Sequence, residues 1–169
     1  MLQSLAVMTR PHVLDSHVET ANTWLNELME SLELSSPADG ARALHALRAG
    51  LHAIRDRLPA SEVVDLGAQL PTLIRGIYYE GWTLTNDPTT IRDRAAMVAR
   101  VKHGLMPDPR LDPVDVLRAV ISLLVEHVTP GEILDVVATL PAPIAALWQD
   151  LTGHAIETLD PREGSTRPH

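Results

Sequence analysis

The two halves of this 169-residue sequence resemble each other when one is shifted by 70 residues. Leu70-Pro71 recurs at this shift as Leu140-Pro141. The same register, without a gap, aligns Leu47-Arg48-Ala49 with Leu117-Arg118-Ala119, Glu62 with Glu132, Asp65 with Asp135, Ala68 with Ala138, Ile74 with Ile144, and Tyr78 with Trp148. One shared dipeptide means little, but a set in one register predicts that an ancestral unit was duplicated in tandem.

Each half is predicted to form four helices; three of them show amphipathic apolar spacing, with steps of three and four residues, and the third in order is predicted from the start and stop signals described below. In the first half these residues are Leu14, Val18, Ala21, Leu25, Leu28 and Leu32, then Leu44, Leu47, Leu51, Ile54 and Leu58, and then Leu73, Ile74 and Ile77. In the second half they are Ile91, Ala95, Val98 and Val101 (a helix from about residue 88 to 101), then Val114, Leu117, Ile121, Leu124 and Val128, and then Ile144, Leu147 and Leu151. No segment alternates as a strand does. We therefore predict an all-α helical bundle of about eight helices, built from two tandem four-helix repeats.

Proline and capping residues predict where these helices begin and end. Asp112-Pro113 is a start signal, because Asp caps a helix and Pro suits its first position. Thr129-Pro130-Gly131-Glu132 fits a capping box, of which residues 59–62 are a weaker version. Each Leu-Pro pair should end one helix, since proline disfavours helical geometry in the residue before it. Pro71 and Pro141 should then be the first residues of the next helices.

The second predicted helix of each half differs in a way that predicts how the halves pack. The second half has a bulky stripe where the first half has only small residues: Val116, Val120 and Leu123 against Ala46, Gly50 and Ala53. We expect these two helices to lie against each other at the centre, the small stripe admitting the bulky one. Glycine inside a helix lowers helix stability by about 1 kcal/mol relative to alanine. A close approach of the two helix backbones would explain why Gly50 is nevertheless found there. Gly50→Leu should then destabilise the protein by overpacking.

The length is typical of one domain. We expect a flexible N-terminus over residues 1–12, one all-α domain over 13–155 and a disordered tail over 156–169. The domain divides into a first repeat (13–82), a linker (83–87) and a second repeat (88–155). Whether translation starts at Met1 or Met8 stays open.

Composition excludes several classes of function. The chain has no cysteine, which excludes thiol catalysis, thiolate metal sites and disulfides. A net charge of −8 opposes nucleic-acid binding. No apolar run approaches the roughly 20 residues of a membrane helix. We expect a cytoplasmic protein that binds neither nucleic acid nor membrane.

Eight histidines raise the question of a metal site, which their spacing answers. His45 and His52 share a helix face but lie about 10 Å apart along it, too far for one ion. His52 with Asp56, or Asp150 with His154, would make only a partial site. Neither Glu-x-x-His repeats nor His-Glu-x-x-His occurs. We interpret the histidines as surface or structural residues, and predict no metal site and no cofactor.

Other catalytic constellations are also missing from the sequence. It contains no Gly-x-Ser-x-Gly and no glycine-rich phosphate loop. Glu62, Asp65, Glu132 and Asp135 fall in the first turns of predicted helices, where the helix dipole favours negative charge. We predict no catalytic residue.

A group of arginines allows two interpretations. Arg48 and Arg55 share a helix face, and with Arg75 and Arg57 they would form an anion-binding patch. Alternatively, they pair with neighbouring carboxylates such as Asp56, as surface charges usually do.

The segment 77–82 holds three of the five Tyr and Trp residues of the chain. Tyr78 aligns with Trp148 and is predicted to be core. Tyr79 aligns with Gln149 and Trp82 with Thr152, so these two residues form an aromatic pair that only the first half has. Glu80, between them, aligns with Asp150. Such residues suit an interaction surface, because each joins a large apolar body to a polar tip. Equally, they would cover the segment from Thr83 to Thr90.

Several strings resemble a known family: residues 47–58 (LRAGLHAIRDRL), 67–71 (GAQLP), 75–82 (RGIYYEGW), and Pro130-Gly131-Glu132 followed by Leu140-Pro141. They are similar to the bacterial family called domain of unknown function 2267, over roughly Val13 to Leu151. Gly50 departs from it, since such sequences usually carry a larger aliphatic residue there. The resemblance implies a small all-helical bacterial protein, with some relatives coupled to stress responses or fused to regulatory domains. It implies no established activity.

Two functions remain open from the sequence. The first is a non-enzymatic module that binds a protein partner or a second copy of itself, in a stress or regulatory setting, through Tyr79, Glu80 and Trp82. The second is a small-molecule or anion binder, or a cryptic enzyme, with a cleft between the repeats. That cleft would be lined by His52, Arg55, Arg75, Tyr79 and Glu80.

Overall fold

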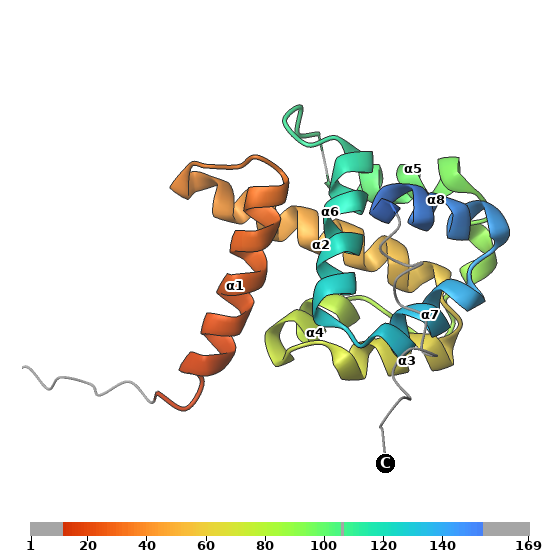
Figure 1. Ribbon diagram of the computed structural model, residues 1–169, viewed down its shortest axis with the longest axis horizontal. Coiled ribbons are helices and arrows are strands. Elements are labelled where there is room, and N and C mark those ends of the chain that lie inside the picture. The colour runs from red at the N-terminus through yellow and green to blue at the C-terminus, as the bar shows by residue number, and fades with distance from the viewer. Residues whose placement is uncertain (1–11, 106, 154–169) are drawn as a thin grey trace, which may run out of the picture.

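The computed structural model describes residues 12–105 and 107–153, which form a bundle of eight α-helices without a strand (Figure 1). The helices are α1 (Asp15–Ser31), α2 (Gly40–Arg57), α3 (Ala60–Gln69), α4 (Thr72–Tyr79), α5 (Arg94–Leu105), α6 (Pro113–His127), α7 (Pro130–Thr139) and α8 (Ala142–Thr152). Two short 3-10 helices, η1 (Pro37–Asp39) and η2 (Pro88–Thr90), precede α2 and α5. The predicted all-α fold of about eight helices is confirmed.

Helix α2 is the central element of the bundle. It crosses the middle of the molecule and packs against α1, α4, α5 and α6 (Figure 1). Half of its 18 residues are buried, including the glycine and four alanines. Because all four neighbours rest on α2, one continuous hydrophobic core runs through both halves of the chain.

The predicted contact between α2 and α6 is confirmed. An atom placed at the Cβ position of Gly50 would lie 2.6 Å from Cγ2 of Val120, so the two backbones approach as closely as glycine allows. Ala46 and Ala53, one turn to either side, are completely buried, as are Val116 and Val120 on α6. The small stripe therefore receives the bulky one.

Helix α5 packs along α2 even more extensively than α6 does. A Cβ on Gly104 of α5 would lie 3.1 Å from the Cβ of Ala49, so this approach is also close. The centre of the protein is thus a three-helix contact, and the sequence predicted only one of its two interfaces.

Most of the predicted helix ends are confirmed. The Asp112 side chain accepts hydrogen bonds from the backbone N–H groups of Val114 and Asp115, and Pro113 is the first residue of α6. Leu70 and Leu140 are extended and end α3 and α7. The prolines after them stand one position before α4 and α8 instead of opening them. The capping box at Thr129 is wrong, because the Thr129 side chain makes no capping hydrogen bond.

The helix bounds recur at the spacing of the sequence repeat. Helix α3 spans 60–69 and α7 spans 130–139, while α4 begins at 72 and α8 at 142. Tyr78 and Trp148, aligned by the same shift, are both buried. The duplication itself stays a prediction that these bounds agree with. The expected flexible end and tail lie outside the described residues, apart from His12.

Helix α1, the first helix of the first half, does not bury all of the apolar residues predicted to face the core. Leu14, just before α1, and Val18 in its first turn are 63% and 39% exposed, whereas Trp24 and Leu28 are buried. The reason is that the first turns of α1 extend beyond the bundle, so only its C-terminal half meets the other helices (Figure 1).

Two further inward positions were also predicted wrongly. Helix α5 begins at Arg94, not near residue 88, and buries Met97, Val101 and Leu105 while Ala95 is exposed. In α4, Leu73 is 43% exposed. In both helices the next residue faces the core instead: Ala96 packs against it in α5 and Ile74 is buried in α4.

We predict that Gly50→Ala lowers the free energy of unfolding by about 1–3 kcal/mol, although alanine is the better helix former. The added methyl carbon has no room beside Val120. Gly76→Ala is the matched control: Gly76 also lies inside a helix, α4, but an added Cβ meets nothing within 4 Å. It should raise stability by up to about 1 kcal/mol. Urea denaturation measures both.

Combining Gly50→Ala with Val120→Ala should recover part of the loss, with a coupling of about 0.5–3 kcal/mol in a double-mutant cycle. Stabilisation by Gly50→Ala equal to that of Gly76→Ala would refute the close contact of α2 with α6.

Candidate functional site

Three of the residues predicted to line a cleft meet at the C-terminal end of α4. His52 Nε2–H donates to the backbone carbonyl of Ile77 at 2.7 Å. Arg55 Nη1 donates to the carbonyls of Tyr78 and Glu80 at 2.6 and 2.8 Å. The last carbonyls of a helix lack most of their intrahelical partners, so these α2 side chains supply donors beside the Glu80 N–H that also reaches Ile77. The arrangement anchors α4 to α2.

Arg55 is buried, at 3% exposure, and each of its three guanidinium nitrogens donates a hydrogen bond. Besides the two carbonyls it forms an ion pair with Asp56, whose other oxygen receives Arg100 of α5 at 2.8 Å. A buried charge is tolerated when it is paired and hydrogen-bonded in this way. Asp56 therefore links α2 to α5.

Arg48 and Glu80 complete this end of α4 at the surface. Arg48 Nε donates to the Glu80 carboxylate at 2.6 Å, and this hydrogen bond lowers the pKa of Glu80. Burial lowers the pKa of His52, which favours the neutral ring.

Arg75 does not join the other arginines. Its guanidinium donates to the carbonyls of Ala68 and Leu70, at 3.2 and 2.9 Å, and so caps the C-terminal end of α3. The sequence placed four arginines in one patch or in pairs with carboxylates. In the structure Arg48 and Arg55 pair with carboxylates, those of Glu80 and Asp56, whereas Arg75 lies apart at the end of α3.

The aromatic pair packs on its own chain. Tyr79 Oη donates to the carbonyl of Val63 at 3.2 Å and lies directly over Gly67, where a Cβ would be 2.2 Å from that oxygen. Tyr78 is buried, as predicted, and donates to the same carbonyl. Trp82 is half-buried, 5.9 Å from the Tyr79 ring. Tyr79 thus covers α3 and not the segment 83–90.

A cavity does lie between the two halves, but none of the five residues predicted to line a cleft is among those that line it. It measures about 600 Å³ and lies between the end of α1 and the first turns of α6. Its lining is polar and carries both charges: Ser31, Leu32, Glu33, Arg110, Leu111, Asp112, Asp115, Arg118, Ala119 and Ser122. Glu33 has a left-handed backbone, with φ of 55°, which is uncommon for a residue other than glycine.

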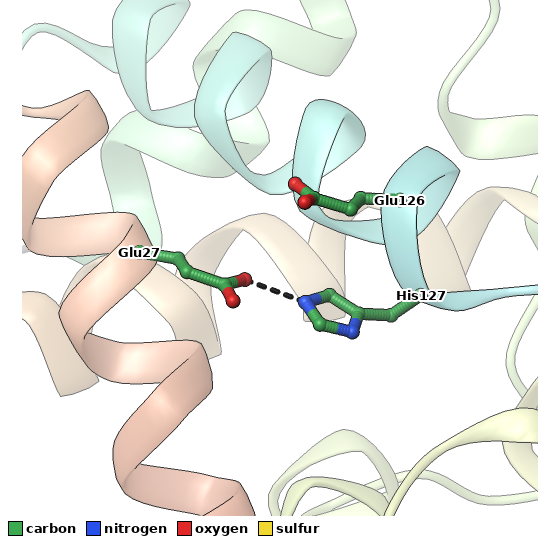
Figure 2. Close-up of side chains that lie close together, drawn as sticks. All are labelled: Glu27, Glu126 and His127. Carbon is green, nitrogen blue, oxygen red and sulfur yellow. Dashed lines mark hydrogen bonds and ion pairs between the residues drawn. The ribbon is translucent and has the colours of Figure 1, made fainter.

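Further along the same two helices, α1 and α6 are joined by a histidine. His127 Nε2 lies 2.5 Å from a Glu27 oxygen, and the ring stacks on Trp24 with centroids 4.7 Å apart. Figure 2 shows Glu27 and His127 meeting across the gap between the helices, with the Glu126 carboxylate on the same side. The ligand atoms of these three residues all lie within 4.8 Å of one another.

Two partly buried glutamates lie on α3 and α7, which pack against each other. Glu62 and Glu132 each have one carboxylate oxygen that is buried and has no hydrogen-bond partner among the described residues. Burial raises the pKa of both groups, and nearby Asp65 and Asp135 raise it further. The helix-dipole interpretation therefore accounts for only part of their environment.

Sequence reasoning missed the residues that lie far apart in the chain. Glu27 and His127 are 100 positions apart, and no spacing rule connects them. Asp39, only 3% exposed, similarly forms ion pairs with Arg42 and Arg110, and so joins η1 to the segment before α6. The one local signal was Trp24, a large aromatic residue beside the predicted apolar stripe.

These features define an all-α helical bundle in which many polar side chains hold helices together. A family model described as "Uncharacterized conserved protein (DUF2267)" matches residues 21–147, and the chain belongs to this family. The resemblance found in the sequence is confirmed. None of the curated proteins compared with the chain matches it. No helix among the described residues is long and apolar enough to cross a membrane.

We predict that Arg55→Met lowers the free energy of unfolding by about 3 kcal/mol or more. The change removes the donors of two carbonyls and one partner of buried Asp56. Arg48→Gln is the control, because its ion pair with Glu80 is largely at the surface and contributes at most about 1 kcal/mol. Equal losses in urea denaturation would show that Arg55 has no special structural role.

We predict that Glu62→Gln combined with Glu132→Gln stabilises the protein at neutral pH, and that this gain shrinks as the pH falls toward 4.5. The folded state raises both pKa values, so it favours the protonated groups. Their contribution to stability is complete below the ordinary glutamate pKa and is lost as pH rises through the folded value. Thermal unfolding between pH 4.5 and 7.5 measures the difference.

Glu30→Gln, an exposed change on α1, should give no such pH-dependent gain. If the stability of the double variant differed from that of the wild type by the same amount at every pH, the raised pKa values of Glu62 and Glu132 would be contradicted.

Proposed function

We propose that this protein is a helical interaction module that associates with a second copy of itself through the first turns of α1. The observation that carries the proposal is the exposed apolar face there. Val13 and Leu14, directly before α1, and Val18 in its first turns are 79%, 63% and 39% exposed, whereas Trp24 and Leu28 in the other half of the helix are buried. The expected regulatory or stress setting rests on the family resemblance alone.

The stripe of α1 continues past the part that the bundle covers. Leu14 and Val18 are four residues apart, and Ala21 and Leu25 continue the same face until they meet the core. Neighbouring apolar side chains of this kind favour burial against another apolar surface. The family match begins at residue 21, so the exposed turns precede it.

A second copy supplies a suitable surface. Two identical apolar stripes are complementary when a two-fold axis relates them, which is the commonest symmetry of protein dimers. A membrane suits this helix less well, because helices that lie on membranes carry Lys and Arg on the polar face. Helix α1 has neither, and its exposed first turns contain Asp15 and Glu19.

We predict that the wild-type chain forms a concentration-dependent dimer, measured by size-exclusion chromatography with light scattering. The double variant Leu14→Glu and Val18→Glu should weaken the dimer at least about tenfold, since burying each side chain contributes roughly 1.5–3 kcal/mol. Added salt should strengthen the wild-type dimer, because it screens the like charges of the two chains.

Leu84→Glu is the matched control: Leu84 is 79% exposed but lies outside α1, so this change should leave the dimer intact. Circular dichroism checks that each variant keeps its helices. A wild-type chain that stays monomeric at high concentration, or a dimer insensitive to the α1 changes, would refute the proposal.

A second candidate, small-ligand binding, is favoured by the cavity between the halves. Its volume of about 600 Å³ suits a small polar molecule, with Arg110 and Arg118 as cationic groups and Ser31 and Ser122 as hydroxyl groups. Both arginines already pair with carboxylates, so a ligand would have to compete with Asp39 and Asp115. Native mass spectrometry separates the two functions, since a dimer doubles the mass whereas a ligand adds a small one.

A further inference from the structure

Glu27, Glu126 and His127 bring three metal-binding side chains together between α1 and α6. Their ligand atoms lie within 4.8 Å of one another (Figure 2). Zinc binds such atoms at about 2.0–2.2 Å, which places neighbouring ligands of a tetrahedral ion about 3.4 Å apart. Small side-chain rotations close this difference, because the side chains of Glu27 and His127 are only partly buried, at 32% and 27% exposure.

The imidazole is held in place before any ion binds. Its ring stacks on Trp24, which is itself buried at 2% exposure, with an interplanar angle of 27°. Nε2 is already directed at the Glu27 carboxylate, 2.5 Å away. A ligand with a fixed orientation loses little conformational freedom on binding, so this histidine is preorganised. A metal ion would take the place of the proton between the two groups.

The donor set selects the kind of ion. One imidazole nitrogen and two carboxylate oxygens suit Zn²⁺, and three protein ligands leave a fourth position open. Mg²⁺ and Ca²⁺ prefer oxygen ligands alone and in larger number. The two carboxylates also balance the charge of a divalent cation.

We infer that Glu27, Glu126 and His127 form a Zn²⁺ site that joins α1 to the last turn of α6. The ion connects two helices whose ligands are 100 residues apart in the chain, so its binding stabilises the packing of α1. The fourth position stays open to water or to an external ligand. The inference goes beyond the proposed self-association and does not depend on it.

The test is calorimetric titration of chelator-treated full-length protein with ZnCl2, together with thermal unfolding with and without Zn²⁺. We expect one ion per chain and a rise in melting temperature. Glu126→Gln should weaken binding at least about tenfold, since even changes outside the ligand shell cost 10–100-fold. This change leaves the Trp24 stack and the contact between Glu27 and His127 in place. His127→Gln should also abolish the site.

His45→Gln is the matched control, because His45 is an exposed histidine of α2 that does not belong to this cluster. It should leave the Zn²⁺ affinity unchanged. The inference is overturned if the wild type binds no Zn²⁺, if Glu126→Gln binds it as tightly as the wild type, or if His45→Gln weakens binding as much as Glu126→Gln. Tighter binding of Mg²⁺ than of Zn²⁺ would also overturn it.

Discussion

The close approach of α2 and α6 at Gly50 holds the two halves of this protein together. A single added carbon would collide with Val120, so the two backbones meet without room for a larger residue. On another side of α2, Gly104 of α5 approaches Ala49 almost as closely. Interiors packed at this density resist changes in volume, and so the small residues of α2 determine how its neighbours are placed. The core of both halves is continuous as a result.

The polar residues of α2 follow from this central position. Helix α4 has only eight residues, too few to be stable alone, and its last carbonyls end beside α2. His52 and Arg55 supply the donors that these carbonyls require. In sequence, a histidine and an arginine one turn apart look like part of a binding site. In the fold they are bound to the backbone, because buried carbonyl groups must be paired.

Helix α1 differs from the others in being only half covered. Its C-terminal half borders the polar cavity and contributes Glu27 to the histidine cluster, while its first turns expose apolar side chains. Both proposals concern this helix, but they use different parts of it. The proposed self-association would use the apolar face at Leu14 and Val18, and zinc would act toward the other end, where α1 meets α6. An ion that tightens the packing of α1 would also hold the apolar face in a defined position.

The sequence by itself determined the helices, most of their ends and the contact of Gly50 with α6. These depend on local chemistry: apolar periodicity, the proline after each leucine, the Asp112 cap, and the match of small with large residues at aligned positions. Only the tertiary structure decided which part of each apolar stripe is covered, so Trp24 is buried while Leu14 is exposed. It also decided which distant side chains meet, as Glu27 and His127 do. The physical reason is that backbone preferences act over a few residues, whereas contacts between helices depend on how the whole chain packs.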